Sequence, residues 1–311
     1  MPRNGTMTES EFIFLKEKIG EVAQQRFDSL PSYISKLYTE KSCPGGWLDF
    51  YSVTGFPDIP SFNGALTTVG KSPGFHVRIE PSQYAAEAIW PRTLLDDDQH
   101  NVIADGGAEL MEAAQRTIEK LSASPFINGE SNSFDFVTVN EEGVGIFSNS
   151  HTTKTGVSTT TGFDNLGSDA LEKTSLAETI IAMNLFKDDN GERYSPPSDY
   201  MIVVPATLQF KLQEILGTQY GYDVTDGQGL KNVMYNKYEP FVWDRLDDYS
   251  TDDWYVVSKS WVKKYMVYLN KVKPEIKTTM DWGTYQTRTA VYARVGFGNI
   301  GWKFGYKHVA S

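Results

Sequence analysis

The chain contains 311 residues, of which 40% are hydrophobic, so it can bury a sizeable core in one large domain or two intertwined ones. Its 40 acidic and 29 basic residues give a net charge of -11, which argues against a protein that reads DNA by neutralising phosphates. The sequence has no run of eighteen apolar residues, which argues against a membrane span. The single cysteine, Cys43, excludes an intramolecular disulfide and a metal site of several thiolates, as expected in a reducing cytoplasm.

The first segment combines one predicted helix with an irregular stretch. Thr8 and Glu11 have the spacing of a capping box, and an amphipathic helix is predicted over 8–27. After this helix, prolines and glycines interrupt regular structure. Large apolar residues follow in what reads as an extended segment, namely Trp47, Phe50 and Tyr51. We therefore expect an arm that lies on another surface.

Residues 56–95 are predicted to form a long hairpin loop. Prolines and glycines separate short β-prone stretches at 65–69 and 75–79. A two-stranded ribbon alone is marginally stable in water. We therefore expect this loop to find its stability on a neighbouring molecule.

The next segment begins at Asp96, Asp97 and Asp98 and leads into a helix predicted over 105–121. Apolar residues recur there at helical spacing, which predicts a long helix lying on a surface. The apolar stripe consists of Leu110, Met111, Ala114, Ile118 and Leu121. Two strands are predicted beyond Pro125, over 134–139 and 144–147, and a polar loop rich in Thr, Ser and Gly follows over 149–162.

Helices and strands alternate over 165–270. The sequence predicts a helix from near Ser168, a strand over 200–204, a helix begun by Pro205 and a strand over 254–257. The tail carries a β-prone run over 287–295, followed by Trp302 and Phe304, and we expect it to pair with the segment that starts at residue 96. The predicted fold class is therefore α+β.

Sequence patterns that carry chemistry elsewhere are present here in the wrong context. Gly296–Gly301 spells G-x-G-x-x-G after a β-prone run, but the chain ends ten residues later, so a dinucleotide site is disfavoured. The acidic turn with His100 lacks the ligand spacing of a calcium loop and is interpreted as a solvated helix start. The four histidines, His76, His100, His151 and His308, are scattered.

Two further chemical functions are disfavoured by the residues around the candidate groups. Ser148 and His151 could suggest nucleophilic catalysis, yet no orienting acid or oxyanion hole is indicated. Aromatic residues could stack on single-stranded nucleic acid, but here they lie beside acidic residues rather than in a basic groove, as at Trp243, Tyr249 and Trp254. We expect no catalytic residue, no cofactor and no metal site.

Several motifs in order resemble the major capsid proteins of tailed bacteriophages, which have the Hong Kong phage type of capsid fold. The resemblance covers roughly residues 75–305, and order and spacing together make it specific. Its parts are the acidic turn Leu95–Asp98, the Phe-Ser-x-x-His-like signal Gly145–His151, the Ser/Thr/Gly-rich loop that follows it, the pair Asn165 and Leu166, the Asp-Asp-x-Gly turn Asp188–Gly191, the Val-Pro signal Met201–Leu208, the strand Asp253–Val257 and the closing segment Gly301–Lys303.

The resemblance implies an architecture and a function. It implies an N-terminal arm over 1–55, an extended hairpin loop over 56–95, a peripheral domain over 96–164 and 271–311 with its spine helix at 105–121, and an axial domain over 165–270. Hexamers and pentamers would form an icosahedral shell, part of a virion assembled in the host cytoplasm, that encloses double-stranded DNA without sequence-specific binding. A scaffolding protein, a portal and decoration proteins are the implied partners.

The resemblance leaves alternatives open. An encapsulin-type compartment shell shares the fold and houses an enzyme cargo, and a soluble enzyme is a third class. Some family members join a hairpin lysine covalently to an asparagine of another subunit, and Lys71 lies in the corresponding segment. No motif identifies the asparagine, so Lys71 is interpreted as a solvated loop residue. We expect a separate scaffolding protein and no large built-in one.

Overall fold

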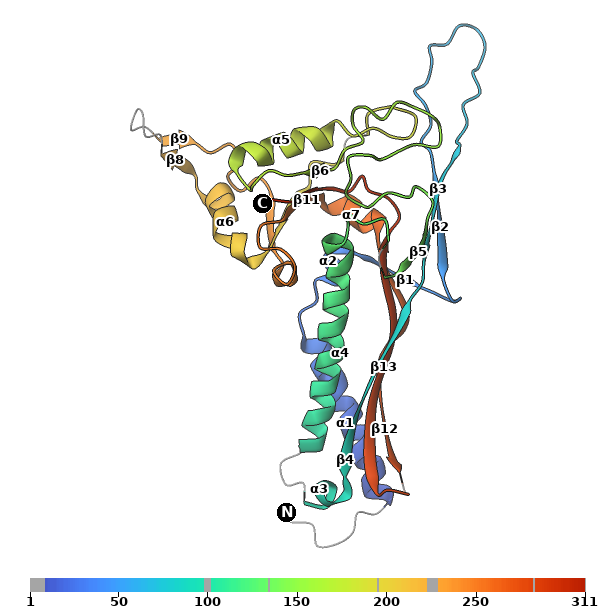
Figure 1. Ribbon diagram of the computed structural model, residues 1–311, viewed down its shortest axis with the longest axis vertical. Helices are drawn as coiled ribbons and strands as arrows, with labels where there is room; N and C mark the ends of the chain where they lie inside the picture. Colours follow the sequence, from blue (N-terminus) through green and yellow to red (C-terminus); the bar gives the residue numbers. More distant parts are fainter. Residues whose placement is uncertain are drawn as a thin grey trace.

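The computed structural model describes residues 9–97, 102–133, 135–194, 196–222, 229–281 and 283–310. Its long, upright part contains two helices beside a narrow sheet (Figure 1). The helices are α1 (Glu9–Ser29) and α4 (Val102–Ile127), and the sheet contains β1 (Thr39–Ser42), β12 (Met266–Asp281), β13 (Gln286–Asn299) and β4 (Ser82–Pro91) in that order. The second part lies across the upper end of the first.

The strand β13 shows how sequence alternation builds the upright part. It pairs antiparallel with β12 on one side and with β4 on the other. Every second side chain of its first ten residues is buried, because successive strand residues point to opposite faces. The buried set is Thr287, Thr289, Val291, Ala293 and Val295, and Val291 packs with Met111 of α4 and Ala23 of α1.

The helices α1 and α4 approach each other closely at a glycine. A Cβ atom built on Gly107 would lie 2.6 Å from Cγ2 of Ile19, so a larger residue there would push the helices apart. Arg26 and Glu112 form an ion pair of 3.1 Å between the two helices. Helix α4 runs beyond its predicted end at residue 121 because Ser122, Ala123 and Phe126 are buried in the core.

The second part is built on a five-stranded sheet with the order β10–β7–β11–β14–β6. Its strands are β10 (Glu239–Val242), β7 (Tyr200–Val204), β11 (Trp254–Ser258), β14 (Gly305–His308) and β6 (Leu166–Gly167). Every residue of β7 and β11 is buried, as expected for strands covered on both faces. The helices α5 (Lys173–Asn184) and α6 (Gln209–Gly217) belong to this part.

A third sheet supports a long projecting loop. The antiparallel strands β2 (Leu48–Val53), β3 (Pro73–Ile79) and β5 (Val137–Asn140) form it, and residues 54–72 extend from its end (Figure 1, upper right). The shorter elements are α2 (Ile34–Leu37), α3 (Arg92–Asp97), α7 (Lys259–Tyr265), the 3-10 turns Ala206–Leu208 and Asp244–Leu246, and the hairpin of β8 (Tyr220–Tyr222) and β9 (Gly229–Lys231).

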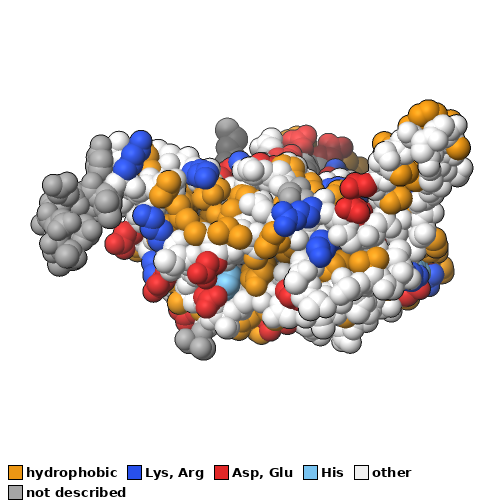
Figure 2. All heavy atoms as spheres, turned by 90° about the horizontal axis from the view of Figure 1, so that it is seen from above, with side chains coloured by type: hydrophobic (Ala, Val, Ile, Leu, Met, Phe, Trp, Pro, Cys, Tyr) orange, Lys and Arg blue, Asp and Glu red, His pale blue; other side chains and the backbone are white. Residues whose placement is uncertain are grey.

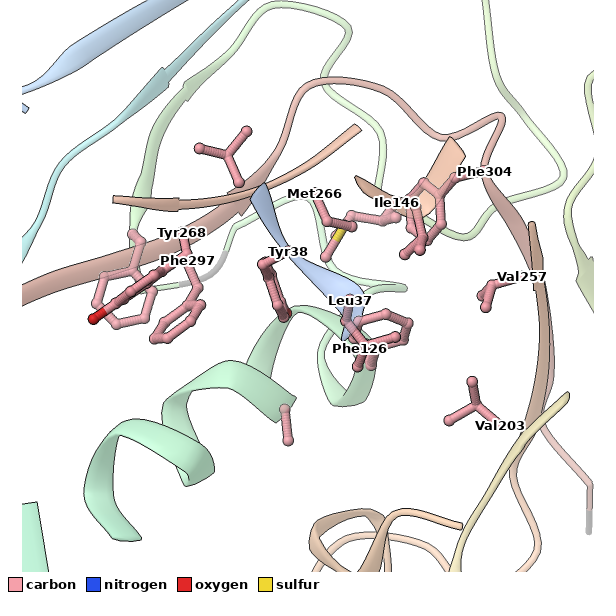
Figure 3. Packing of buried hydrophobic residues seen from close by; sticks show 14 of the residues in the cluster. Leu37, Tyr38, Phe126, Ile146, Val203, Val257, Met266, Tyr268, Phe297 and Phe304 are labelled. Atoms are coloured by element: carbon pink, nitrogen blue, oxygen red, sulfur yellow. The ribbon is translucent and has the colours of Figure 1, made fainter. Parts of the chain in front are cut away.

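One hydrophobic cluster joins the upright part to the five-stranded sheet. Phe126 at the end of α4 packs beside Leu37 and near Phe304, while Val203 and Val257 reach the same cluster from β7 and β11 (Figure 3). A second cluster fills the space between the opposite face of this sheet and its helices, with Leu176 and Leu212 at 0% and 1% exposure.

Most predicted elements are confirmed. The helices of 8–27 and 105–121 are present, as are the strands over 75–79, 200–204, 254–257 and 287–295 and the helix that follows Pro205. The helix predicted near Ser168 starts later, at Lys173, where Glu172 and Ser175 form a capping box.

Three expectations were wrong. The segments 65–69 and 144–147 are not strands, although Ile146 and Phe147 are buried. The tail does not pair with the segment from residue 96: β13 pairs with β12 and β4, and β14 joins the five-stranded sheet. Sequence reading also missed β12 as a strand. The capping residue Thr8, together with Asp98 and His100, lies outside the described residues.

Candidate functional site: a polar junction and the projecting loop

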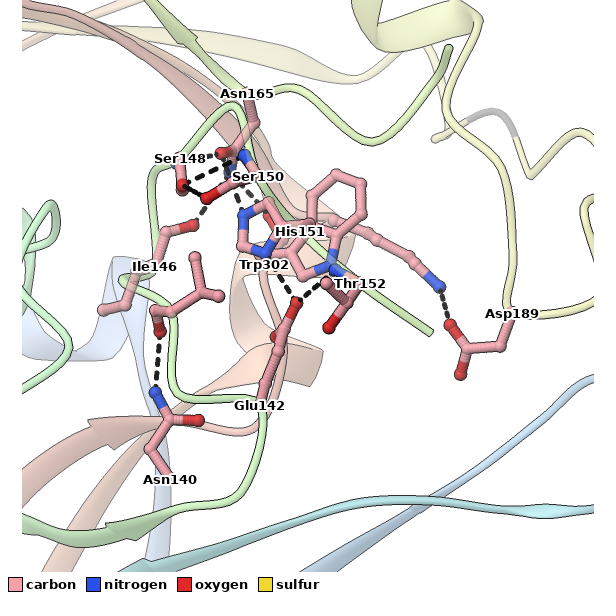
Figure 4. A network of polar contacts seen from close by, with 12 residues as sticks. Asn140, Glu142, Ile146, Ser148, Ser150, His151, Thr152, Asn165, Asp189 and Trp302 are labelled. Carbon is pink, nitrogen blue, oxygen red and sulfur yellow. Dashed lines mark hydrogen bonds and ion pairs between the residues drawn. The ribbon is translucent and has the colours of Figure 1, made fainter. Parts of the chain in front are cut away.

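Asn165 is the centre of a buried polar junction that ties three chain segments together (Figure 4). Its Nδ2 donates to the carbonyl oxygens of Ile146, Trp302 and Gly305 at 2.9, 3.4 and 3.2 Å. Its Oδ1 accepts from the backbone N–H of Ser148 at 2.7 Å. The side chain is fully buried, and these contacts fix its orientation because only the nitrogen can donate to carbonyls.

His151 lies in the same junction and has both ring nitrogens occupied. Nε2 lies 3.1 Å from Oδ1 of Asn165 and Nδ1 lies 2.9 Å from Oε1 of Glu142, while the ring stacks on Trp302 with centroids 4.3 Å apart. The Ser148 hydroxyl is instead 3.0 Å from the Ser150 hydroxyl. The ring therefore has no free nitrogen to activate Ser148, and the serine–histidine pair is part of a structural network.

Replacing Asn165 with alanine is expected to destabilise the subunit by at least about 2 kcal/mol, because each buried polar group left without a partner costs about 1–3 kcal/mol. Urea denaturation of the unassembled subunit measures the loss. Asn128→Ala is the matched control, because its side chain bonds only at the surface, to Ser124 at 3.3 Å. Equal midpoints for the two variants would contradict a structural role for the junction.

His308 of β14 is a second buried histidine, and its hydrogen bonds identify it as neutral. Nδ1 accepts from the backbone N–H of Asp169 at 3.2 Å. The hydroxyl of Thr179 donates to the carbonyl of Ser175 at 2.7 Å, so Nε2–H must be the donor in its 2.8 Å contact with Thr179. Burial lowers the pKa of His308 to about 4, against a smaller opposing effect of Asp169.

This depressed pKa predicts acid sensitivity. An unfolded histidine has a pKa of about 6.5, so below that pH the unfolded chain takes up a proton that folded His308 excludes, and stability is lost as pH falls towards about 4. We expect the free energy of unfolding to fall by about 2 kcal/mol between pH 7 and pH 5 through this group. Urea denaturation of the wild type and of His308→Gln at both pH values isolates the contribution of His308. If the free energy of unfolding of the variant fell as much with pH as that of the wild type, His308 would not be the source of the pH dependence.

The base of the projecting loop is closed by polar contacts. Thr54 and Ser72 exchange two hydrogen bonds of 3.0 and 2.8 Å across it. Asn190 donates to the carbonyl of Gly55 at 2.8 Å. A cavity of about 490 Å³ lies beside this base and is also lined by His151 and Trp302. The junction around Asn165 and the base of the loop therefore border one cavity.

Below the loop, the carboxylate of Asp49 in β2 links this strand to β3 through side-chain hydrogen bonds. Asp49 accepts hydrogen bonds from Arg78 at 2.7 and 3.2 Å, and its Oδ1 lies 2.9 Å from Nε2 of His76. The hydrogen bond from Arg78 holds the pKa of Asp49 at about 2, so this link persists through ordinary pH values. His76 is thus a structural residue of the loop base.

The loop itself exposes large apolar side chains. Ile59 and Leu66 are 90% and 92% exposed, and Phe56 and Phe62 are also exposed. Figure 2 shows hydrophobic atoms on the projection at the upper right of this face. Lys71 lies 4.7 Å above the ring of Phe56. Isolated exposed apolar residues are ordinary, but a group of four on one projection marks a contact surface.

The other candidates from the sequence are placed apart from one another. Gly296–Gly301 continues β13 to Asn299 and leads through a turn into β14, so it opens no helix for a pyrophosphate. Of the aromatic group, Trp243 and Trp254 are fully buried, whereas Tyr249 is 60% exposed.

Within the described ranges, no three His, Cys, Asp or Glu residues gather as metal ligands, and no helix is long and apolar enough to cross a membrane. Asp97 is exposed in α3, apart from the junction.

Sequence reading missed the partners that make these sites. Trp302 reaches His151 from a distant segment, Glu142 does so from nine residues earlier in the chain, and Lys307 is a fully buried lysine beside two carboxylates. No local pattern announces them, because a Lys between Tyr306 and His308 reads as an ordinary strand residue. Neither the apolar pattern nor the charge pattern of the sequence predicts that Glu119 of α4 is buried. Desolvation by burial raises the pKa of its carboxyl group above the ordinary value.

Comparison with solved structures finds shell proteins. The chain matches the capsid of the cyanophage P-SCSP1u with a TM-score of 0.57 and 14% identity over 90% of this chain and 88% of that chain. The capsid of an empty GTA particle matches with a TM-score of 0.57 and 11% identity over 90% of each chain. A virus-like particle from Pyrococcus furiosus matches with a TM-score of 0.51 and 8% identity over 94% of this chain and 98% of that chain. At these identities the likeness establishes the fold, a mixed α+β fold of tailed-phage capsids.

The sequence comparisons supply the family. No curated protein matches the chain significantly by sequence. The model of the family described as phage capsid protein matches residues 77–308, which is well over half of the chain. This chain therefore belongs to the phage capsid protein family and is a major capsid protein of a tailed-phage-like shell, a structural subunit without enzymatic activity.

Proposed function

We propose that the subunits form hexamers and pentamers that close into an icosahedral shell around double-stranded DNA. One observation carries this proposal. The subunit exposes 16781 Å², whereas a compact monomer of 34.9 kDa exposes about 13,000 Å². The excess is more than a standard protein interface buries, about 1,200–2,000 Å². Several partners around each subunit would cover it.

The projecting loop and α1 supply the surfaces for these partners. Ile59, Phe62 and Leu66 on the loop, and Phe14 on α1, are exposed apolar side chains on long elements. Burying such a side chain contributes about 1.5–3 kcal/mol. Many such contacts per subunit reinforce one another once the shell closes, because each later contact forms within an already tethered assembly.

The division into structural regions is part of the proposal. Residues 1–55 serve as the arm and the extended loop lies within 56–95, with residues 54–72 as its projecting end. The peripheral region contains α4 and the long strands. The axial region contains 165–270, and we add β14 to it because β14 is hydrogen-bonded to β11 and β6. A scaffolding protein, a portal and decoration proteins complete the shell.

The acidic balance of the chain fits enclosure of DNA. A net charge of -11 would let packaged DNA lie against the shell without adhering, within a screening length of about 8 Å at physiological salt. Acidic residues of the segment 96–164 contribute to this inner wall. A map of an assembled shell with a basic lumen would overturn this assignment.

Negative-stain electron microscopy with size exclusion, on the chain expressed alone, tests the proposal. We expect closed shells, tubes or capsomer-sized rings. A single small closed size formed without scaffold would instead favour the compartment-shell alternative. A monomer that fails to assemble even with crowding agents or added scaffold would contradict the proposal.

A further inference from the structure

The end of the chain carries a lysine that is buried between two carboxylates. Lys307 of β14 has 0% side-chain exposure. Its Nζ lies 2.6 Å from Oε1 of Glu130 and 3.3 Å from Oδ2 of Asp253, and 3.4 Å from the carbonyl oxygen of Ile127. Asp253 is itself 4% exposed, whereas Glu130 is 42% exposed. Lysine is almost never fully buried unless it is paired.

The sheet register brings Lys307 and Asp253 together. Lys307 pairs with Tyr255 across the antiparallel strands β14 and β11. Asp253 precedes Tyr255 by two residues, so it lies diagonally opposite Lys307 on the same face, within reach of a long side chain. Glu130 comes from the turn that follows α4.

The two oxygens of Asp253 are in different situations. Oδ1 accepts from the hydroxyl of Ser250 at 2.8 Å, which holds the carboxyl group in place. Oδ2 is buried and accepts no hydrogen bond in the described structure, although it faces Nζ of Lys307. The rings of Tyr255 and Tyr249 lie 5.6 and 5.8 Å from Nζ. An amine and a carboxyl carbon are therefore held together in an aromatic, largely dry setting.

We propose that Lys307 and Asp253 form an intramolecular isopeptide bond, with Glu130 as the proton carrier. The bond would form within one subunit and would not require assembly into a shell. A proton first passes from Nζ to Oδ2 of Asp253, which leaves an amine and a carboxylic acid. Nζ then attacks Cγ of Asp253 and its proton passes to Glu130. The C–N bond forms, a C–O bond breaks, and Glu130 returns the proton to the departing hydroxyl, which leaves as water.

Burial favours this condensation. A buried ion pair keeps a large desolvation penalty, and uncharged forms are favoured away from water. Amide formation removes one positive and one negative charge from the interior. The partly exposed Glu130 retains access to solvent, into which the water molecule departs. The bond would tether the last strand to β11 and close a loop between residues 253 and 307, which restricts the unfolded chain.

Peptide mapping of the folded, purified wild-type protein tests the bond. After denaturation and trypsin digestion, mass spectrometry is expected to find the peptide of Lys307 branched to the peptide of Asp253, lighter than their sum by one water molecule. Trypsin does not cleave after an acylated lysine, so the peptide that begins at His308 should be lost. Full recovery of both linear peptides would mean an ion pair only and would overturn the proposal.

Three variants sharpen the test. Asp253→Asn would condense with loss of ammonia and yield the same branched peptide as the wild type. Glu130→Gln keeps the shape of the side chain but cannot accept and return a proton, so cross-linking should fall at least tenfold. Asp252→Asn, at the exposed neighbouring carboxylate, is the matched control and should cross-link fully. Undiminished cross-linking in Glu130→Gln overturns the role of Glu130, and linear peptides in Asp253→Asn count against the bond itself.

Discussion

Phe126→Ala is expected to destabilise the unassembled subunit by about 3–5 kcal/mol, the cost typical of deleting a buried aromatic ring. Phe126 has 0% exposure at the end of α4. Its ring lies 5.5 Å from that of Trp243 and 5.6 Å from that of Tyr255, both in edge-on geometry. Because the main cluster joins the upright part to the five-stranded sheet, the cavity would weaken the joint between them.

Urea denaturation of the unassembled subunit measures this effect, since assembly would mask it by mass action. Phe210→Ala is the matched control: it removes the same ring from a position in α6 that is 76% exposed. We expect that variant to unfold close to the wild-type midpoint. A Phe126→Ala midpoint as high as that of Phe210→Ala would show that the joint does not depend on this ring.

The double replacement Ile59→Ser and Leu66→Ser is expected to block assembly without unfolding the subunit. Both side chains are at least nine-tenths exposed, so the subunit loses no internal packing. If each is buried against a neighbour, the loss is about 1.5–3 kcal/mol per side chain. Since about 1.4 kcal/mol corresponds to a tenfold change in affinity, the subunit concentration needed for shells should rise roughly 100-fold or more.

Light scattering against protein concentration, with electron microscopy of the products, measures this shift. Ile59→Leu with Leu66→Ile is the matched control, because it changes side-chain shape and keeps the apolar area. It should assemble near the wild-type concentration. Normal assembly of the serine double variant would show that the loop tip makes no contact between subunits.

The elements that the sequence predicted well are those whose periodicity reflects local burial. The stripe of α4 and the continuous apolar runs of β7 and β11 follow directly from which face of each element is covered. The segment 144–147 was misread because Ile146 and Phe147 are buried without pairing to a strand. Burial alone thus resembles a strand pattern when the chain passes through the core as a loop.

The partners of each element were not readable from local pattern. The expectation that the tail pairs with the segment from residue 96 was wrong, because β13 lies between β12 and β4. Only the assembled four-stranded sheet decides which strands pair, since any β-prone run can pair with several others. The same holds for Lys307 and Asp253, which are far apart in sequence and meet through strand register.

The α+β class, the main helices and strands and, through motifs in order, the resemblance to tailed-phage capsid proteins could all be predicted from the sequence. These depend on periodicity and on residue order, which one chain displays along its length. The junction at Asn165, the neutral state of His308 and the buried lysine between two carboxylates became visible only in the folded chain. Each of these depends on contacts between segments far apart in the chain, which form only when the whole core closes around them.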